Sequence, residues 1–371
     1  MMGSLLNARW PQRVLALPWR ILLLVAGIGA FAVVVLYSAA GGSMQPWALN
    51  HAVRFSIFLG AAIMIAQVPI GFWLRIAYPL YAVVLVALIG VEIVGGISGG
   101  SQRWLDLGFI RLQPSEFMKL AIVIALARFY HYLPRGYAAR LPGIWPPLAL
   151  IGMPFLLVIL QPDLGTSLMI VAGGATMMFL GGLPLRWFLI PGAAGIAALP
   201  LIYNLLHDYQ KRRVLIFLDP SADPLGAGYH ITQSKIAIGS GGLTGKGFLE
   251  GSQSHLQYLP EQHTDFVFAT MAEEWGLMGG AALLISYGLV LNWGIRVGLQ
   301  ARTQFGRLLA AGLSMTILFY VLINSMMVMG LAPVVGIPFP LVSYGGSAMM
   351  TVMIALGIIM GVYRQRHLEH L

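Results

Sequence analysis

The sequence predicts an all-α polytopic membrane protein with about ten transmembrane helices and one long extracytoplasmic loop. Of its 371 residues, 58% are hydrophobic and only 9% are charged, whereas soluble domains carry about 25% charged residues. Apolar stretches near the length that crosses a bilayer core, about 20 residues, recur along the chain. The absence of cysteine excludes a disulfide-stapled secreted scaffold. We therefore expect residues 1–371 to form a single transmembrane domain.

Ten segments match the length and composition of a membrane span. The first is too long for a cleaved signal peptide and lacks its small-residue cleavage pattern. The fifth and sixth are short and separated only by residues 161–165, which leaves open a broken or re-entrant pair. The ten segments are Leu17–Ala39, Ala52–Ile70, Ile76–Val94, Ser115–His131, Trp145–Leu160, Thr166–Leu180, Leu185–Leu206, Phe266–Leu291, Gly306–Met329 and Ser347–Tyr363.

The basic residues predict the orientation of these spans. With the amino terminus in the cytoplasm, 13 of the 22 basic residues fall on the inner side, and Glu369 is the acid beside them. They are Arg9, Arg13, Arg20, Arg75, Arg128, Arg135, Arg140, Arg186, Arg296, Arg302, Arg307, Arg364 and Arg366. Because cytoplasmic loops are enriched in Lys and Arg, both termini are expected in the cytoplasm. Much of the net charge of +9 is then an orientation signal and requires no nucleic-acid partner.

Residues 207–265 form the long outer loop, and a connection of this length is typical of a functional segment. Within it, Tyr229–Ile238 reads as a short amphipathic helix that lies on the membrane surface or packs on the bundle. The glycine-rich run 239–247 resembles a phosphate loop, but one residue is missing between the glycines, and Gly247 stands where Ser or Thr would bind magnesium. A turn that allows close backbone approach is the favoured interpretation, with amides that contact a diphosphate as the alternative.

Four histidines in this loop raise the question of a metal site. They lack the HExxH pattern and any pair at i, i+4 spacing, so a structural zinc site is not expected. Solvated or hydrogen-bonded side chains are favoured instead. The four are His207, His230, His255 and His263.

Two charged residues stand at the outer start of the fourth span. Glu116 and Lys119 are three residues apart, a spacing that places both on one helix face, where they can pair. Pro114 fits the first helical turn, with Glu116 near the positive end of the helix dipole. Charges inside a membrane usually face a bundle interior or a polar cavity. The pair is therefore either a structural ion pair or the wall of a cavity for a charged head group.

Further acids lie where polar segments meet apolar helices. Asp265 either caps the helix that follows it or serves as a partly desolvated general base that a lipid-borne substrate can reach. Glu273 and Glu274 follow within that helix, and one of them is expected to be a second buried acid. Asp163 is favoured as a helix cap. Residues 333–347 are rich in turn formers and low in charge, which predicts a rigid cover near the site.

On several long motifs the sequence resembles the SEDS family (shape, elongation, division and sporulation proteins), over essentially the whole chain. The region of Lys235 and Gly245–Gly247, the stretch at 218–220 and the short amino terminus favour its elongation branch over its division branch. The motifs are Gln113-Pro114-Ser115-Glu116 with Lys119, Gln161-Pro162-Asp163-Leu164-Gly165-Thr166, Leu218-Asp219-Pro220 with Asp223-Pro224-Leu225-Gly226 and Gly228-Tyr229-His230, Gln233 to Gly242, Leu259-Pro260-Glu261 with His263-Thr264-Asp265-Phe266, and Pro340 to Ser347.

This resemblance implies a peptidoglycan glycosyltransferase of the cell inner membrane that polymerises lipid II for cell elongation and rod shape. It also implies membrane lipids, the elongation machinery and a class B penicillin-binding protein, a transpeptidase, as partners. Asp265 matches the family's essential aspartate and would act as the base in an inverting transfer. Glu116 would hold Lys119 in place, and Ser343 of the last motif is expected to contact substrate. Outer-face cations expected to stabilise the leaving diphosphate are Lys119, Arg103, Arg212, Arg213 and Lys235.

Two other classes of function stay open beside this one. A lipid II flippase or transporter would also use about ten spans and intramembrane charges, but transporters usually place those charges at the midplane within repeated halves. No repeat is evident here, and the acids cluster outward. A non-catalytic scaffold for the crosslinking partner would leave Asp265 as a cap. No cofactor is evidently required; a divalent cation stays open, although the sequence shows no dedicated ligand set.

Overall fold

The computed structural model describes residues 15–94, 96–98, 101–106, 111–134, 136–198, 201, 203–204, 208–223, 226–256, 258–259 and 261–368. Within them, each predicted span coincides with a helix, although the bounds shift by several residues. These helices are α3 (Trp19–Ala39), α4 (Ala48–Ile65), α5 (Ile70–Val94), α6 (Pro114–Tyr132), α7 (Leu141–Leu160), α8 (Leu164–Leu180), α9 (Arg186–Ala197), α14 (Val267–Gln300), α15 (Gln304–Val328) and α16 (Gly346–Leu368).

Seven of these helices are long and apolar enough to cross a membrane: α3, α4, α5, α7, α14, α15 and α16. Helix α6 has the length but carries three charged residues, α8 has 17 residues, and α9 has 12. The predicted seventh span, Leu185–Leu206, is thus a helix only as far as Ala197 among the described residues. The predominantly helical membrane fold agrees with the prediction, and the count of ten spans stays a prediction.

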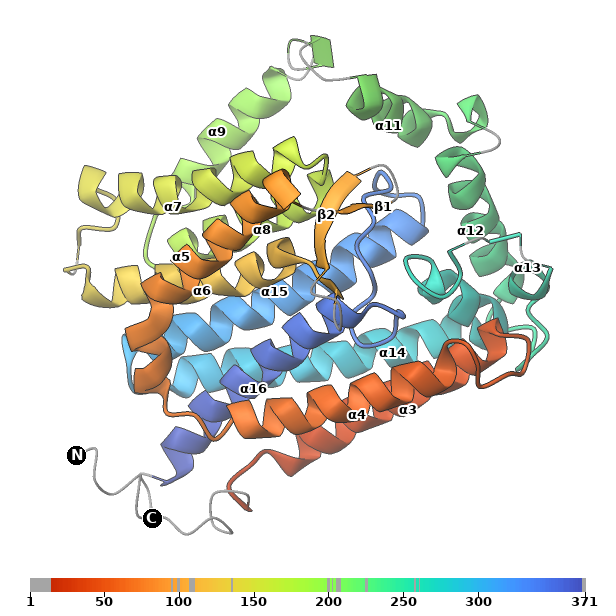
Figure 1. Ribbon diagram of the computed structural model, residues 1–371, viewed down its shortest axis with the longest axis horizontal. Coiled ribbons are helices and arrows are strands. Elements are labelled where there is room, and N and C mark those ends of the chain that lie inside the picture. The colour runs from red at the N-terminus through yellow and green to blue at the C-terminus, as the bar shows by residue number, and fades with distance from the viewer. Residues whose placement is uncertain are drawn as a thin grey trace.

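The helices form one elongated bundle, with α14 and α15 side by side along it (Figure 1). Helix α6 lies at its centre, because Met118–Ala127 are buried on every face, as expected of a helix surrounded by others. Helix α3 begins, and α16 ends, at the end opposite α12 (Ala227–Gly241) and α13 (Ser252–His255) (Figure 1). The charge pattern predicts that the end with α12 and α13 faces outward, and we call it the outer end.

The connection between α7 and α8 consists of only three residues, 161–163. The two helices pack against each other, so the short fifth and sixth segments are separate helices joined by a tight turn. Asp163 precedes α8, and its side chain accepts a hydrogen bond from the Thr166 amide at 3.1 Å. Its predicted role as a helix cap is confirmed.

The long outer loop is largely helical. It contains α11 (Asp208–Leu218), the 3₁₀ turn Pro220–Ala222, α12 and α13, whereas its predicted first residue, His207, lies outside the described residues. The predicted amphipathic helix at Tyr229–Ile238 is α12. It packs on the bundle, since Ile231 is buried and the Ser234 hydroxyl donates to the Val328 carbonyl at 2.7 Å.

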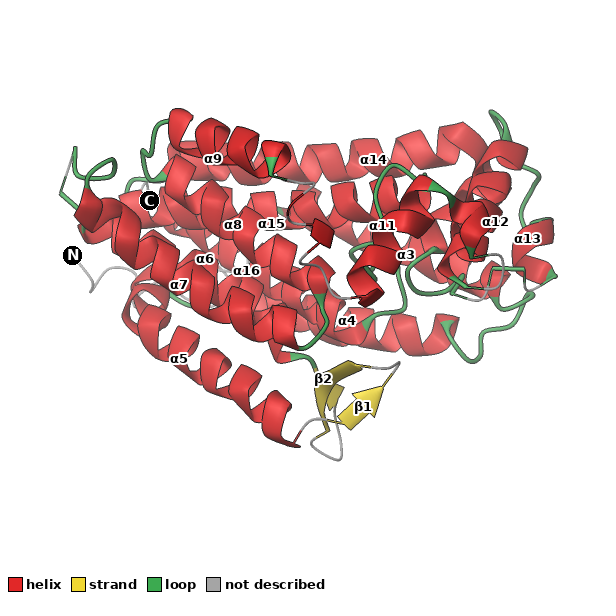
Figure 2. Ribbon diagram, turned by 90° about the horizontal axis from the view of Figure 1, so that it is seen from above, coloured by secondary structure: helices red, strands yellow, loops and turns green. Residues whose placement is uncertain are grey.

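A small antiparallel sheet follows α5 and was not predicted from the sequence. Its strands, β1 (Gly96–Ser98), β2 (Ser101–Asp106) and β3 (Arg111–Leu112), pair in the order β1-β2-β3. The sheet lies at the edge of the bundle beside the end of α5 (Figure 2). Its functional consequence is that β2 carries Arg103 to the turn between α7 and α8.

The glycine-rich run 239–247 packs against a kink in α14. Gly276 has non-helical dihedral angles there, φ 62° and ψ −163°. A Cβ on Gly245 would lie 2.0 Å from the Glu274 carbonyl oxygen, and the Lys246 amide donates to the Glu273 carbonyl at 3.0 Å. The Gly247 amide donates in turn to the Glu274 carbonyl at 3.1 Å. The amides of Lys246 and Gly247 are therefore already hydrogen-bonded within the protein. The predicted close backbone approach is confirmed, and the structure gives no support to the diphosphate alternative at these two amides.

Candidate active site

Asp265 lies at the outer end of the bundle, in the turn before α14, and its side chain is partly exposed. The helix begins at Val267 with Phe266 as its N-cap residue, and no side chain caps it. The alternative role of Asp265 as a cap is therefore wrong. Its carboxylate makes no hydrogen bond to any residue that the structure describes, and Oδ2 lies over Gly336, 3.5 Å from where a Cβ on that residue would stand. No described residue thus competes with a ligand for the proton-accepting oxygens of this carboxylate.

The backbone around Asp265 is held by the late loop that follows α15. The Asn324 side-chain amide donates to the Asp265 carbonyl at 2.8 Å and to the Ile337 carbonyl at 2.7 Å. The Ser343 hydroxyl donates to the Thr264 carbonyl at 2.6 Å and accepts from the Phe339 amide at 2.8 Å. These bonds join the loop to the Asp265 segment, so the predicted rigid cover lies where it was expected.

The surroundings raise the pKa of Asp265 from its ordinary value of 3.8 to about 6. Burial of the carboxylate is the largest cause, and the negative charges of Glu261 and Asp163 act in the same direction, while Arg103 opposes them. Glu261 is held in place by the Thr264 hydroxyl, which donates to its carboxylate at 2.5 Å. A carboxylate with a pKa near neutrality is a stronger base than an ordinary aspartate and is still ionised at neutral pH.

Arg103 and Asp163 form an ion pair within electrostatic reach of Asp265. Their closest atoms, Nε and Oδ2, are 3.8 Å apart, and the guanidinium also donates to the carbonyl of Pro162 at 2.5 Å. The start of α8 packs directly on the late loop, because a Cβ on Gly165 would lie 2.6 Å from the Val335 carbonyl oxygen. The predicted cation Arg103 is thus brought to the Asp265 region, but in a paired state.

Glu116 and Lys119 form the predicted ion pair, with 2.5 Å between Nζ and Oε1. The Tyr320 hydroxyl donates to the second carboxylate oxygen of Glu116, and Lys119 Nζ lies 4.2 Å from the centre of the Tyr320 ring. Glu116 is 4% exposed and Lys119 is 2% exposed. This arrangement favours the structural ion pair over an open cavity wall, and contact of either residue with substrate stays a prediction.

The remaining predicted binding residues have different environments. Lys235 is exposed on α12, with its side chain against Gly330. Ser343 is buried and engaged by backbone groups, as described above. Arg212 and Arg213 belong to α11, but their side chains lie outside the described part of the structure.

Both acids that follow Asp265 on α14 are buried, where the sequence predicted one. Glu273 pairs with Lys246 at 2.6 Å and also accepts from the Gln253 amide at 3.0 Å. Glu274 accepts from the Ser38 hydroxyl. Both therefore act in holding the outer loop and α3 against α14.

Sequence reasoning missed Tyr320 and Asn324, which contact the two predicted acidic positions. Both are buried on α15, and they are four residues apart, so they share one helix face. A tyrosine and an asparagine at this spacing within an apolar span were the available signal. Among the described residues, no group of three or more His, Asp or Glu side chains is arranged to hold a metal ion.

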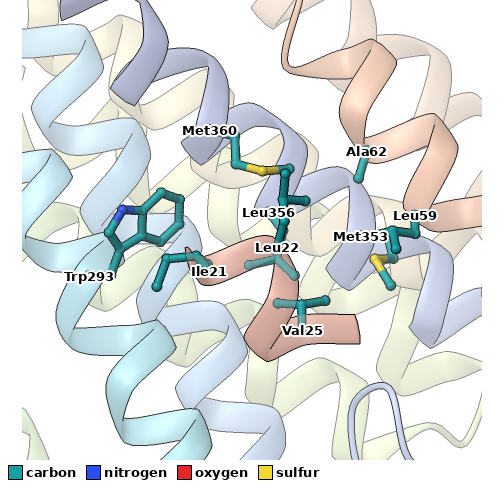
Figure 3. Close-up of a pocket in the computed structure, with 9 residues that line it drawn as sticks. All are labelled: Ile21, Leu22, Val25, Leu59, Ala62, Trp293, Met353, Leu356 and Met360. Carbon is teal, nitrogen blue, oxygen red and sulfur yellow. The ribbon is translucent and has the colours of Figure 1, made fainter. Parts of the chain in front are cut away.

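A small cavity elsewhere in the bundle is apolar and contains none of these residues. It lies between α3, α4, α14 and α16 (Figure 3). Its lining is Ile21, Leu22, Val25, Leu59, Ala62, Trp293, Met353, Leu356 and Met360. It is therefore separate from the polar site around Asp265.

Comparison with known proteins identifies the family. The family model described as cell cycle protein, covering FtsW, RodA and SpoVE, matches residues 15–368. The chain is 45% identical over 350 residues to the peptidoglycan glycosyltransferase MrdB of Escherichia coli K12, with 93% of each chain covered.

Two solved structures share the fold. One, described as structural coordination of polymerization and crosslinking by a peptidoglycan synthase complex, contains a chain that matches with a TM-score of 0.81 and 34% identity, covering 95% of this chain and 99% of that one. The rod shape determining protein RodA of Thermus thermophilus matches with a TM-score of 0.71 and 30% identity, covering 95% and 98%. The chain therefore belongs to the FtsW/RodA/SpoVE family, the SEDS family that its motifs indicate.

Proposed function

We propose that this chain is a peptidoglycan glycosyltransferase that polymerises lipid II at the outer face of the membrane. The observation that carries the proposal is the carboxylate of Asp265, which is partly exposed at the outer end and makes no hydrogen bond to the described residues. Its raised pKa suits a general base. The 45% identity to a protein named as a peptidoglycan glycosyltransferase supports the same activity.

In the proposed reaction, Asp265 takes the proton of the acceptor sugar's 4-hydroxyl as that oxygen attacks the donor's anomeric carbon. The bond from this carbon to the diphosphate breaks, and the polyprenyl diphosphate leaves with the electron pair. A single displacement inverts the centre, so an α-linked donor yields a β-1,4 linkage. Arg103 and Lys235 are the described candidates for stabilising the developing negative charge, whereas Lys119 is sealed behind Glu116 and Tyr320.

We propose that the reaction needs no organic cofactor. A divalent cation that accompanies the diphosphate is the alternative. Assays with chelator and with added magnesium or manganese distinguish the two.

The proposed setting is the bacterial inner membrane, with both termini in the cytoplasm and residues 207–265 outside. The proposed partner is a class B penicillin-binding protein that crosslinks the new strand. The likeness to a chain of a synthase complex that coordinates polymerisation and crosslinking supports this pairing. The likeness to a rod shape determining protein supports a role in elongation. A division-type polymerase is the alternative within the family.

The test is polymerisation of lipid II by the purified chain, alone and with its transpeptidase partner. Asp265→Asn is expected to abolish glycan strands while the protein stays folded, and Glu250→Gln, at an exposed carboxylate, should leave them unchanged. Normal polymer from Asp265→Asn would remove the base from the mechanism. Lipid II movement across vesicles without polymer would identify a flippase, and polymer from neither preparation would identify a scaffold.

A further inference from the structure

We propose that Arg54, supported by the ring of Tyr344, forms a phosphate-binding site at the outer end of α4 that takes the diphosphate of the acceptor lipid. The proposal rests on the proposed function, because it names where the second substrate is anchored. Its evidence is the state of the Arg54 side chain and the connection of Tyr344 to the Asp265 segment.

Arg54 is an exposed arginine near the outer end of a membrane-spanning helix. It is the seventh residue of α4, and its guanidinium carbon lies 4.8 Å from the centre of the Tyr344 ring. It makes no hydrogen bond or ion pair with any residue in the described ranges. A ring under the guanidinium face leaves the N–H groups at its edge free to donate.

Three other outer cations already pair with carboxylates, and Lys235 packs its side chain against Gly330. Arg103 pairs with Asp163, Lys119 with Glu116, and Lys246 with Glu273. Arg54 differs because its guanidinium lies over an aromatic ring and pairs with no carboxylate among the described residues. A guanidinium with free edge donors fits a phosphate better than a lysine does, since it can bind two oxygens at once.

Tyr344, whose ring lies beneath Arg54, is hydrogen-bonded to the segment that carries Asp265. The Tyr344 amide donates to the His263 carbonyl at 2.8 Å, two residues before Asp265. The His263 ring stacks on Trp47, the residue that precedes α4, with 4.2 Å between ring centres. Arg54 and Asp265 are therefore held in one assembly of α4, the Asp265 turn and the late loop.

Arg54 and the Asp265 carboxylate nevertheless meet different parts of the late loop, because Arg54 lies over Tyr344 whereas Asp265 Oδ2 lies over Gly336. The two diphosphates of the reaction differ in this respect. The donor's diphosphate leaves from the carbon under attack, next to the base. The acceptor's diphosphate lies a disaccharide away from the hydroxyl that Asp265 would deprotonate. The separation of Arg54 from the base therefore fits the acceptor's diphosphate.

A phospholipid head group offers the same phosphate chemistry at the same depth, so the experiment compares both sources. Binding of undecaprenyl diphosphate and of phosphatidylglycerol is measured by native mass spectrometry on the full chain in detergent. The variants are Arg54→Gln, Arg54→Lys and Tyr344→Leu. Arg75→Gln, at an exposed arginine near the opposite end of the bundle on α5, is the matched control.

We expect Arg54→Gln to weaken undecaprenyl diphosphate binding roughly tenfold, the usual effect of losing a hydrogen bond to a charged group. Arg54→Lys and Tyr344→Leu should weaken undecaprenyl diphosphate binding by a smaller factor. Binding of phosphatidylglycerol should not change in any of the variants. With lipid II as substrate, the KM of Arg54→Gln should rise by about the same factor while kcat changes less. Arg75→Gln should match the wild type, and thermal unfolding of Arg54→Gln should be unaltered because the side chain is exposed.

Unchanged diphosphate binding in Arg54→Gln would overturn the site. An equal loss of phosphatidylglycerol binding would show that Arg54 binds phospholipid head groups in general. A fall in kcat at constant KM would show that Arg54 acts on the donor's leaving group. Either result would overturn the proposal. If the wild type makes no polymer, the proposed function fails, while the binding measurement still decides whether Arg54 holds a diphosphate.

Discussion

The ammonium group of Lys246 lies 2.6 Å from the carboxylate of Glu273 and joins the outer loop to the helix that begins two residues after Asp265. Glu273 is completely buried and also accepts from the Ser252 hydroxyl at 3.1 Å. A buried carboxylate held in this way depends on its cation, because removing one partner leaves the other charge uncompensated.

Lys246→Met is accordingly expected to lower the free energy of unfolding by about 3 kcal/mol, the low end for breaking a buried pair, because the Lys246 side chain itself is 28% exposed. Glu273→Gln should cost less, since the amide oxygen still accepts from Ser252 and no charge is left buried in the helix. Thermal unfolding of the purified protein measures both. Lys235→Met, at an exposed lysine, is the control, and an equal melting temperature for the two lysine variants would contradict the prediction.

Glu261→Gln should move the acid side of the pH–rate profile to lower pH. The Glu261 charge raises the pKa of Asp265, so removing that charge lowers it and leaves more of the base ionised in acid. Arg103→Gln should have the opposite effect, because the arginine lowers this pKa. Lipid II polymerisation between about pH 5 and about pH 8 reports both changes. Shifts of the same sign in the two variants would show that neither acts through charge.

Asp265→Asn should make the protein more stable at neutral pH while abolishing its activity. The pKa of Asp265 is raised from 3.8 to about 6, so its ionised form is less favourable in the folded protein than in the unfolded chain. The destabilisation grows as pH rises through this interval and is absent below it. We expect a gain of about 3 kcal/mol at neutral pH, measured by thermal unfolding, and no gain near pH 3.5. Glu250→Gln provides the comparison, and an equal gain in stability in that variant would contradict the interpretation.

Asn324→Leu should impair catalysis through the position of Asp265. The amide donates to the carbonyls of Asp265 and Ile337, and leucine leaves both without this partner, at a cost of about 1–3 kcal/mol. Asn324→Asp, of the same shape, should be worse, since it turns a carboxylate oxygen towards those carbonyls. We expect kcat to fall more than KM rises. A normal kcat for either variant would show that the late loop positions Asp265 without Asn324.

Local features of the site could be predicted from the sequence. Three-residue spacing predicted the pair of Glu116 and Lys119, and the position before an apolar helix predicted the cap at Asp163. Short-range geometry determines both contacts, so the order of residues is sufficient information.

Contacts between distant segments could not be predicted. Tyr320 is 204 residues from Glu116, and Lys246 is 27 residues from Glu273. Nothing in the periodicity of either segment selects the partner, because packing of whole helices brings them together. The short sheet that carries Arg103 was missed for a related reason: its strands have three, six and two residues, too few for an alternating pattern to stand out.

The bend at Gly276 divides α14 into two mechanical parts. The outer part, Val267–Trp275, carries Glu273 and Glu274 and starts beside Asp265, and it is joined to the loop by the bonds of Lys246 and Gly247. The inner part continues through the bundle to Gln300. The outer loop is therefore bonded to the same short helical segment that begins beside Asp265, and the bend sets that segment off from the remainder of the helix.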